Sequence, residues 1–108
     1  MKKLVLLFLL LPALSYSQIV VKVFNAEWKK TNGFHWVNKL KDVKTIGYTD
    51  IGKNTKAQSK YKIAVVPTII IFKDGEEVAR FQADLSFKMV ATREEVQEEI
   101  DEQLMSDF

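Results

Sequence analysis

The sequence predicts a single α/β domain in which a mixed central sheet of about four strands is flanked by helices. Three observations support this fold class. In the first half, β-branched runs alternate with short segments of helical spacing, which is typical of parallel strands joined by crossovers. In the second half, two strand-like runs flank an Asp-Gly pair, which is typical of an antiparallel hairpin. A helix with a clear start signal follows, so the expected order of elements is βαβαββα.

The first 17 residues have the layout of a secretory signal. Two lysines precede the apolar run Leu4–Leu14, and Ser15 and Ser17 place small side chains at the two positions that a signal peptidase reads. This run is too short for a membrane span, which needs about 20 residues. A buried helix is the alternative, but Pro12 argues against it. We expect cleavage before Gln18, so that residues 18–108 form one exported domain, periplasmic or secreted, of a bacterium.

Removal of the signal makes the remaining domain electrically neutral. The full chain has 16 Lys+Arg and 14 Asp+Glu, and two lysines but no acids leave with the signal. A neutral domain has no electrostatic footprint for nucleic acid or for an anionic membrane, so neither is expected as a partner. With one histidine and no cysteine, neither a transition-metal site nor a disulfide is expected. No cofactor is predicted, and packing alone has to stabilise the fold.

The first half of the domain contains two predicted strands, two predicted helices and a turn. Two β-branched runs predict strands, and apolar residues at helical spacing predict the first helix. A turn rich in Gly and Asn precedes the second helix. In order, these elements are the strand Ile19–Phe24, the helix Asn32–Lys41, the strand Lys44–Thr49, the turn Asp50–Asn54 and the helix Ala57–Tyr61.

The second half gives the clearest local patterns. Thr68–Phe72 is a continuous apolar strand that we expect to be buried on both faces. An Asp-Gly pair at 74–75 predicts a hairpin turn into the alternating strand Glu77–Ala83. Thr92 and Glu95 fit a capping box, in which each side chain binds the other residue's backbone N–H. The buried stripe of the helix that follows is expected at Val96, Ile100 and Leu104.

Residues 85–91 have the character of an insertion before that last helix, and their pattern does not indicate where they pack. Exposed Phe87 and Met89 would form an apolar patch suited to a partner, whereas core packing is the default. The last helix is rich in Glu. A solvated face explains this better than a partner-binding face, and its first acids also suit the helix dipole.

Two segments resemble the thioredoxin superfamily when they are read with this order of elements. The apolar strand that runs into Ala-Glu-Trp at 26–28 is similar to the strand before the Cys-Gly-Pro-Cys redox motif of thioredoxins. Val-Pro-Thr at 66–68, with the strand and turn after it, is similar to the family's cis-proline segment. The resemblance covers residues 19–104 and begins after the extra strand and helix with which thioredoxins usually start. It implies a thioredoxin-like fold with a cis bond before Pro67.

The same resemblance implies that the redox chemistry is lost. The two redox cysteines of the family fall on Lys29 and Asn32, with Lys30 and Thr31 between them. Neither lysine nor asparagine can form the mixed disulfide of thiol exchange. The buried acid that handles protons in thioredoxins falls on Val23. The resemblance thus gives no catalytic residue, and a family name would describe the fold of this chain and not its activity.

The degenerate motif allows a binding role of its own. Lys29 and Lys30 would lie at a helix N-terminus, where backbone N–H groups favour anions. In the alternative, Thr31 or Asn32 caps the helix and the lysines are solvated. His35 lies one turn after Thr31, but without a third group the pair is a poor candidate for nucleophilic catalysis.

Three functions stay open. The first is a non-catalytic module that binds an extended protein or peptide partner of the cell envelope, since strand pairing needs backbone groups and no cysteine. The second is an enzyme that uses a thiol cosubstrate such as glutathione, with Thr31 and Asn32 as the available groups. The third is a structural subunit of an envelope complex. The sequence indicates neither the identity of the partner nor the oligomeric state. The residues expected in the peptide groove are Trp28, Thr31, Val66 and Pro67.

Overall fold

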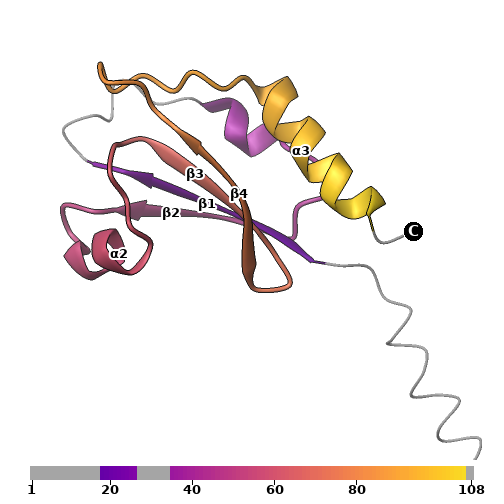
Figure 1. Ribbon diagram of the computed structural model, residues 1–108, viewed down its shortest axis with the longest axis horizontal. Coiled ribbons are helices and arrows are strands. Elements are labelled where there is room, and N and C mark those ends of the chain that lie inside the picture. Colours follow the sequence, from indigo (N-terminus) through magenta and orange to yellow (C-terminus); the bar gives the residue numbers. More distant parts are fainter. Residues whose placement is uncertain (1–17, 27–34, 107–108) are drawn as a thin grey trace, which may run out of the picture.

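Four strands form one mixed sheet in the computed structural model, which describes residues 18–26 and 35–106 (Figure 1). The strand order is β2-β1-β3-β4, with β2 parallel to β1 and the other neighbours antiparallel. The predicted fold class and the βαβαββα order are confirmed. The strands are β1 (Ile19–Asn25), β2 (Thr45–Asp50), β3 (Thr68–Lys73) and β4 (Glu76–Gln82), and the helices are η2 (His35–Lys39), α2 (Thr55–Lys60) and α3 (Arg93–Met105).

One face of the sheet carries the main core. Helix α3 and η2 lie on this side, and α2 lies on the other (Figure 1). Alternate residues of β1 and β3 point to α3, as the two-residue period of a strand requires. Burial of each of these aliphatic side chains contributes about 1.5–3 kcal/mol. The core residues are Ile19, Val21, Val23, Val37, Leu40, Ile69, Ile71, Val96 and Ile100.

The start of α3 follows the predicted capping box. The Thr92 hydroxyl accepts the Glu95 backbone N–H at 3.2 Å, and the Glu95 carboxylate accepts the Thr92 backbone N–H at 3.1 Å. Val96 and Ile100 are fully buried, and Leu104 is partly buried against the same core. The capping box and the apolar stripe are therefore confirmed.

The opposite face of the sheet is covered only in part. Helix α2 and the loop after it bury the end of β1 around Phe24 and Ile70. Toward the start of β1, Val20, Lys22 and Phe72 are only half-buried on this face. Tyr61, at the C-terminal end of α2, contacts Lys22 and Phe72 but leaves them partly exposed. The sheet thus has one fully covered face and one half-covered face.

The helix predicted at 32–41 is a 3-10 helix, and not an α-helix, over the residues that the structure describes. His35–Lys39 is a 3-10 helix, and the Leu40 backbone N–H donates to the Val37 carbonyl at 3.2 Å, which is the three-residue bond of that tighter turn. The chain then bends at Asp42, whose φ is 63°. Helical spacing over one or two turns does not separate a 3-10 helix from an α-helix, and this explains the difference.

The segment 85–91 packs partly against the body of the domain. Met89 contacts the α3-side core and Phe87 contacts the α2-side core. Core packing, the default expectation for these two residues, is therefore confirmed, and the condition for an apolar patch made by them is not met. Instead, Leu85 is 92% exposed and Val90 is 65% exposed.

The strand and hairpin boundaries agree with the sequence patterns to within about one residue. Asp74 and Gly75 both have positive φ, 51° and 89°, as a tight hairpin turn demands. Within the part of the chain that the structure describes, no helix has the length and apolar character needed to cross a bilayer. The expected signal segment lies outside the described residues, and its cleavage stays a prediction.

Candidate functional site

The expected groove is described on one side only. Trp28, Thr31 and the remaining positions of the degenerate motif, Lys29, Lys30 and Asn32, lie outside the described residues. Their part in the site stays a prediction. Val66 and Pro67 lie in the loop between α2 and β3, where both side chains are buried.

The loop before β3 is fixed from within. The Val66–Pro67 peptide bond is cis. The Thr68 hydroxyl donates to the Val65 carbonyl at 2.7 Å, and the Pro67 carbonyl accepts the Ala83 backbone N–H at 3.0 Å. Thr68 is fully buried, and a buried hydroxyl needs a hydrogen-bond partner. The Val65 carbonyl supplies that partner from within the loop. These contacts hold the loop in one conformation at the start of the central strand.

Val66 is the exception in this loop. It is 3% exposed, and its side chain packs against the α2-side core with Phe24 and Ile70. Among the described residues, no hydrogen bond reaches its backbone N–H or C=O. Buried backbone polar groups nearly always have partners in native proteins. These two groups are therefore left for water, for residues that the structure does not describe, or for a bound peptide.

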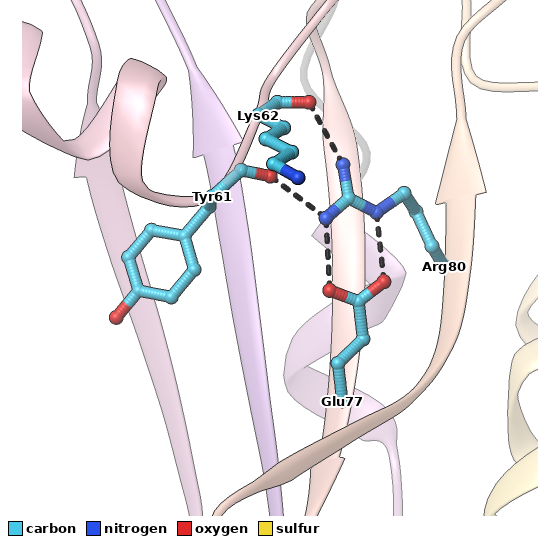
Figure 2. Close-up of polar contacts among 4 residues, drawn as sticks. All are labelled: Tyr61, Lys62, Glu77 and Arg80. Atoms are coloured by element: carbon cyan, nitrogen blue, oxygen red, sulfur yellow. Dashed lines mark hydrogen bonds and ion pairs between the residues drawn. The ribbon is translucent and has the colours of Figure 1, made fainter.

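Arg80 ties the same loop to β4. Figure 2 shows its guanidinium between the Glu77 carboxylate and the backbone carbonyls of Tyr61 and Lys62. It donates to the Tyr61 carbonyl at 2.7 Å, to the Lys62 carbonyl at 3.0 Å, and to both Glu77 oxygens at 2.8 and 2.9 Å. The bond from Arg80 lowers the pKa of the Glu77 carboxyl below its ordinary 4.5. We call this arrangement the Arg80 clamp.

The Arg80 clamp depends on a β-bulge that the sequence pattern did not reveal. In a regular strand, residues three apart point to opposite faces. Here Ile71 is opposite Ala79 while Phe72 is opposite Glu77, so Val78 is an extra residue in β4. The bulge brings Glu77 and Arg80 to the same face, and it lets Val78 and Ala79 both pack on the α3 side. The alternation expected for Glu77–Ala83 is therefore broken at Val78, while Ala79, Arg80 and Phe81 still alternate.

The chemistry available near this loop excludes thiol exchange. The chain has no cysteine. Val23, on which the family's buried acid falls, is 3% exposed in the α3-side core and has no titratable group. The residues that the structure describes contain no group of His, Asp or Glu side chains placed to hold a metal ion. The described part of the site can therefore bind through backbone groups, whereas dithiol exchange is excluded by the lack of cysteine.

The chain is similar in sequence to short stretches of two thioredoxins. No protein-family model matches the chain. Thioredoxin of Chlamydia pneumoniae is 50% identical over 36 residues, which are 33% of this chain and 35% of that protein. Thioredoxin Y1, chloroplastic, of Arabidopsis thaliana is 41% identical over 54 residues, which are 50% of this chain and 31% of that protein. The matches span about a third of the length of these two relatives.

Solved structures give a longer likeness. Thioredoxin-2, a component of malaria parasite protein secretion machinery, superposes with a TM-score of 0.64 at 21% identity, covering 80% of this chain and 84% of that chain. A mutant thioredoxin from Halobacterium salinarum gives a TM-score of 0.60 at 19% identity, covering 81% of this chain and 75% of that chain. At such identities the likeness shows the fold alone. The chain therefore has the thioredoxin superfamily fold and, since it contains no cysteine, it lacks the Cys-x-x-Cys motif of dithiol exchange.

Proposed function

We propose that this redox-inactive thioredoxin-like chain is a binding module that holds an extended peptide segment against the backbone of Val66. One observation carries the proposal: the N–H and C=O of Val66 have no partner among the described residues. An extended peptide that pairs with a single residue supplies one acceptor and one donor at the spacing of a strand. Such pairing uses only backbone groups, so the loss of both cysteines does not prevent it.

The surroundings of Val66 support this role because they are rigid. The Val66 side chain is buried in the core, and the Arg80 clamp holds the two carbonyls at the start of the same loop. A preformed backbone site loses little conformational entropy when a peptide binds, and this favours affinity. The thiol-cosubstrate alternative places its groups, Thr31 and Asn32, outside the described residues and gains no support from this geometry.

We further propose that the domain works after export, as the predicted signal requires. The described fold begins at Gln18, whose backbone N–H donates to the Asp74 carboxylate at 3.0 Å. Cleavage before Gln18 would leave every contact given above in place. It would also turn this N–H into an α-ammonium, so that the hydrogen bond becomes an ion pair. The mass of the protein recovered from the periplasm of a bacterial host tests the cleavage: an unprocessed chain would contradict it.

The binding role is tested by hydrogen exchange at the Val66 amide. A photo-crosslinking residue at Ala64, which is exposed and two residues before Val66, first captures partners from an envelope extract. The same residue at exposed Glu98 on α3 is the matched control. The crosslinked segment of the partner is then made as a synthetic peptide. We expect this peptide to slow exchange of the Val66 amide and to leave the α3 amides unchanged.

A backbone substitution sharpens the same test. Replacing Val66 by its α-hydroxy acid removes the N–H and keeps the side chain, and no described residue loses a bond to that N–H. Peptide affinity should fall by about tenfold, the value of one hydrogen bond. Three results would contradict the proposal: equal capture at Ala64 and Glu98, a Val66 amide already protected in the free protein, or unchanged affinity of the ester variant.

A further inference from the structure

A lysine occupies the middle of the sheet on its half-covered face. Lys22 lies in β1, a central strand, opposite Gly47 of β2 and Ile70 of β3. A charged residue at such a position is costly unless its head group reaches water or a polar partner. Lys22 is half-buried, and its ammonium donates to the Tyr61 hydroxyl oxygen at 2.9 Å. The sheet therefore presents a fixed positive charge on this face.

Two lysine ammonium groups lie close to the Tyr61 ring. The Lys22 ammonium lies 4.9 Å from the centre of the Tyr61 ring and 5.0 Å from that of Phe72. The Lys60 ammonium lies 5.2 Å from the centre of the Tyr61 ring. Lys56, one turn before Lys60 on α2, faces the same region. In the described part of the chain, no carboxylate forms an ion pair with any of these three lysines.

These lysines line a cavity between β1, β2 and α2. Its volume is ≈ 390 Å³, within the range of about 300–1,000 Å³ that is usual for small-molecule sites. The remaining polar lining includes Thr49, Asn54 and the Tyr61 hydroxyl, and no Asp or Glu takes part. Because the Tyr61 oxygen accepts from Lys22, its own O–H proton is available to a ligand. The cavity thus offers several donors and an excess of positive charge.

Gly47 keeps this cavity open. It pairs with Lys22 across the two strands, so a side chain there would point to the same face as the Lys22 side chain. A Cβ atom built at Gly47 meets no other atom within 4 Å. Glycine weakens a strand interior and often marks a place where a ligand comes close to the backbone. The open space beside Gly47 therefore lies next to the positive charge of Lys22.

We propose that this cavity binds a small organic polyanion with at least two phosphate or carboxylate groups, held by Lys22, Lys56 and Lys60. Three ammonium groups without a carboxylate repel one another, and a ligand with two or more negative charges relieves that repulsion. The aromatic ring and the cavity volume leave room for an apolar part next to the charged groups. Polyanion binding in this cavity needs no peptide at Val66, so a failure of either proposal leaves the other untouched.

Calorimetric titration of the processed protein tests the site, with pyrophosphate and citrate as probes for the phosphate and carboxylate classes. We expect saturable 1:1 binding of at least one of them. The better probe identifies the class of ligand. The Lys22 hydrogen bond lowers the pKa of the Tyr61 phenol, and a bound polyanion opposes this effect. The Tyr61 pKa, followed by NMR, should therefore rise when the probe binds.

Variants separate a built site from general charge attraction. The double variant Lys56→Gln/Lys60→Gln should weaken binding by at least about tenfold, since it removes two charged donors. Gly47→Val fills the cavity without removing charge and should do the same. The control Lys41→Gln/Lys88→Gln removes as much charge at exposed positions away from the cavity, and it should change affinity less than about twofold.

Three results would overturn the proposal. Absence of binding by both probes, equal loss in the two double variants, or full affinity in Gly47→Val each shows that the cavity is not a site. Urea unfolding of every variant confirms that the fold is intact. If Gly47→Val does not fold, Gly47→Ser takes its place, because the smaller side chain still enters the cavity.

Discussion

The two faces of the sheet differ in what fills them. On the α3 side, five aliphatic residues of β1 and β3 join four from the η2 region and α3 in a core that is closed to water. On the α2 side, the same strands present Phe24 and Ile70 at one end but Lys22 and Phe72 at the other. The second end is held by polar contacts of Lys22 with Tyr61 and of Arg80 with Glu77.

This difference separates stability from recognition in a domain of limited size. Apolar burial, the largest favourable term in folding, is concentrated on the α3 face. The α2 face contributes less, and it carries the features to which we assign binding: the Val66 backbone and the cavity beside Lys22. If the comparison is right, substitutions on the α3 face change stability, and substitutions on the α2 face change local geometry, ionisation and ligand binding.

The largest effect is expected in the α3-side core. Ile71→Ala should lower the free energy of unfolding by about 2–5 kcal/mol, because it leaves a cavity between β3 and α3. The half-buried Val20→Ala on the other face, measured by the same urea unfolding, should cost less than about 1.5 kcal/mol. Similar costs for the two variants would contradict the division between the faces.

The Arg80 clamp should give the next largest effect. Arg80→Met removes the donors to two carbonyls and to Glu77, and it should cost about 1–3 kcal/mol, with the lower end favoured by partial exposure. Glu77→Gln keeps the carbonyl bonds and should cost less. Hydrogen exchange of the amides at 61–66 should accelerate in Arg80→Met alone, and unchanged exchange there would contradict a positioning role.

The same clamp predicts a pH dependence. Since Arg80 lowers the pKa of Glu77 in the folded state, the ion pair stabilises the fold fully above pH 4.5, the ordinary value. This contribution is lost as the pH falls from 4.5 through the lowered folded value. The difference in unfolding free energy between the wild type and Glu77→Gln should therefore shrink on acidification. A difference that is constant from pH 7 to pH 2 would contradict the ion pair.

The capping box on the α3 side should give a smaller effect. Thr92→Ala removes the acceptor for the Glu95 N–H and should cost about 1 kcal/mol. Thr92→Ser keeps the hydroxyl and serves as the matched control, with a cost close to zero. Thermal unfolding of the two variants is sufficient, and a loss in Thr92→Ser as large as in Thr92→Ala would assign the effect to the methyl group.

The smallest change in stability is expected at Lys22. Lys22→Met loses one hydrogen bond but keeps the apolar stem, so the unfolding free energy should change by less than about 1 kcal/mol. The pKa of Tyr61 should rise, because the Lys22 bond is the main cause of its lowering. NMR titration checks this, with Tyr48 as the internal reference. A Tyr61 pKa that does not move would remove Lys22 from the described geometry.

Particular elements show how far the sequence could be interpreted. The capping box at Thr92 and the Asp-Gly turn at 74–75 depend on neighbours within three residues, so their patterns predicted the structure. The β-bulge at Val78 and the clamp of Arg80 depend on β3 and on the loop before it, which lie elsewhere in the chain. No local period can indicate a contact whose partner is set by strand pairing.

The candidate sites follow the same division. Val66 and Pro67 were predicted as groove residues because a contiguous motif carries them, and that role stays a prediction. The cavity was missed because Lys22, Gly47 and Lys60 come from separate elements, and each has an ordinary reading by itself. Lys22, in an otherwise apolar strand, was the sequence feature that could have indicated the cavity. Whether it marks a binding site depends on which half of the sheet face is left uncovered, and the sequence does not show this.

By itself, the sequence determined the fold class, the order of elements and the absence of thiol chemistry. The absence of thiol chemistry follows from composition, and the order of elements follows from patterns among residues close together in the chain. The tertiary structure alone decided which face of the sheet is closed, which backbone groups are without a described partner, and where three lysines line one cavity. Burial and charge at a point in space are sums over residues distant in the chain, so they exist only once the strands have paired.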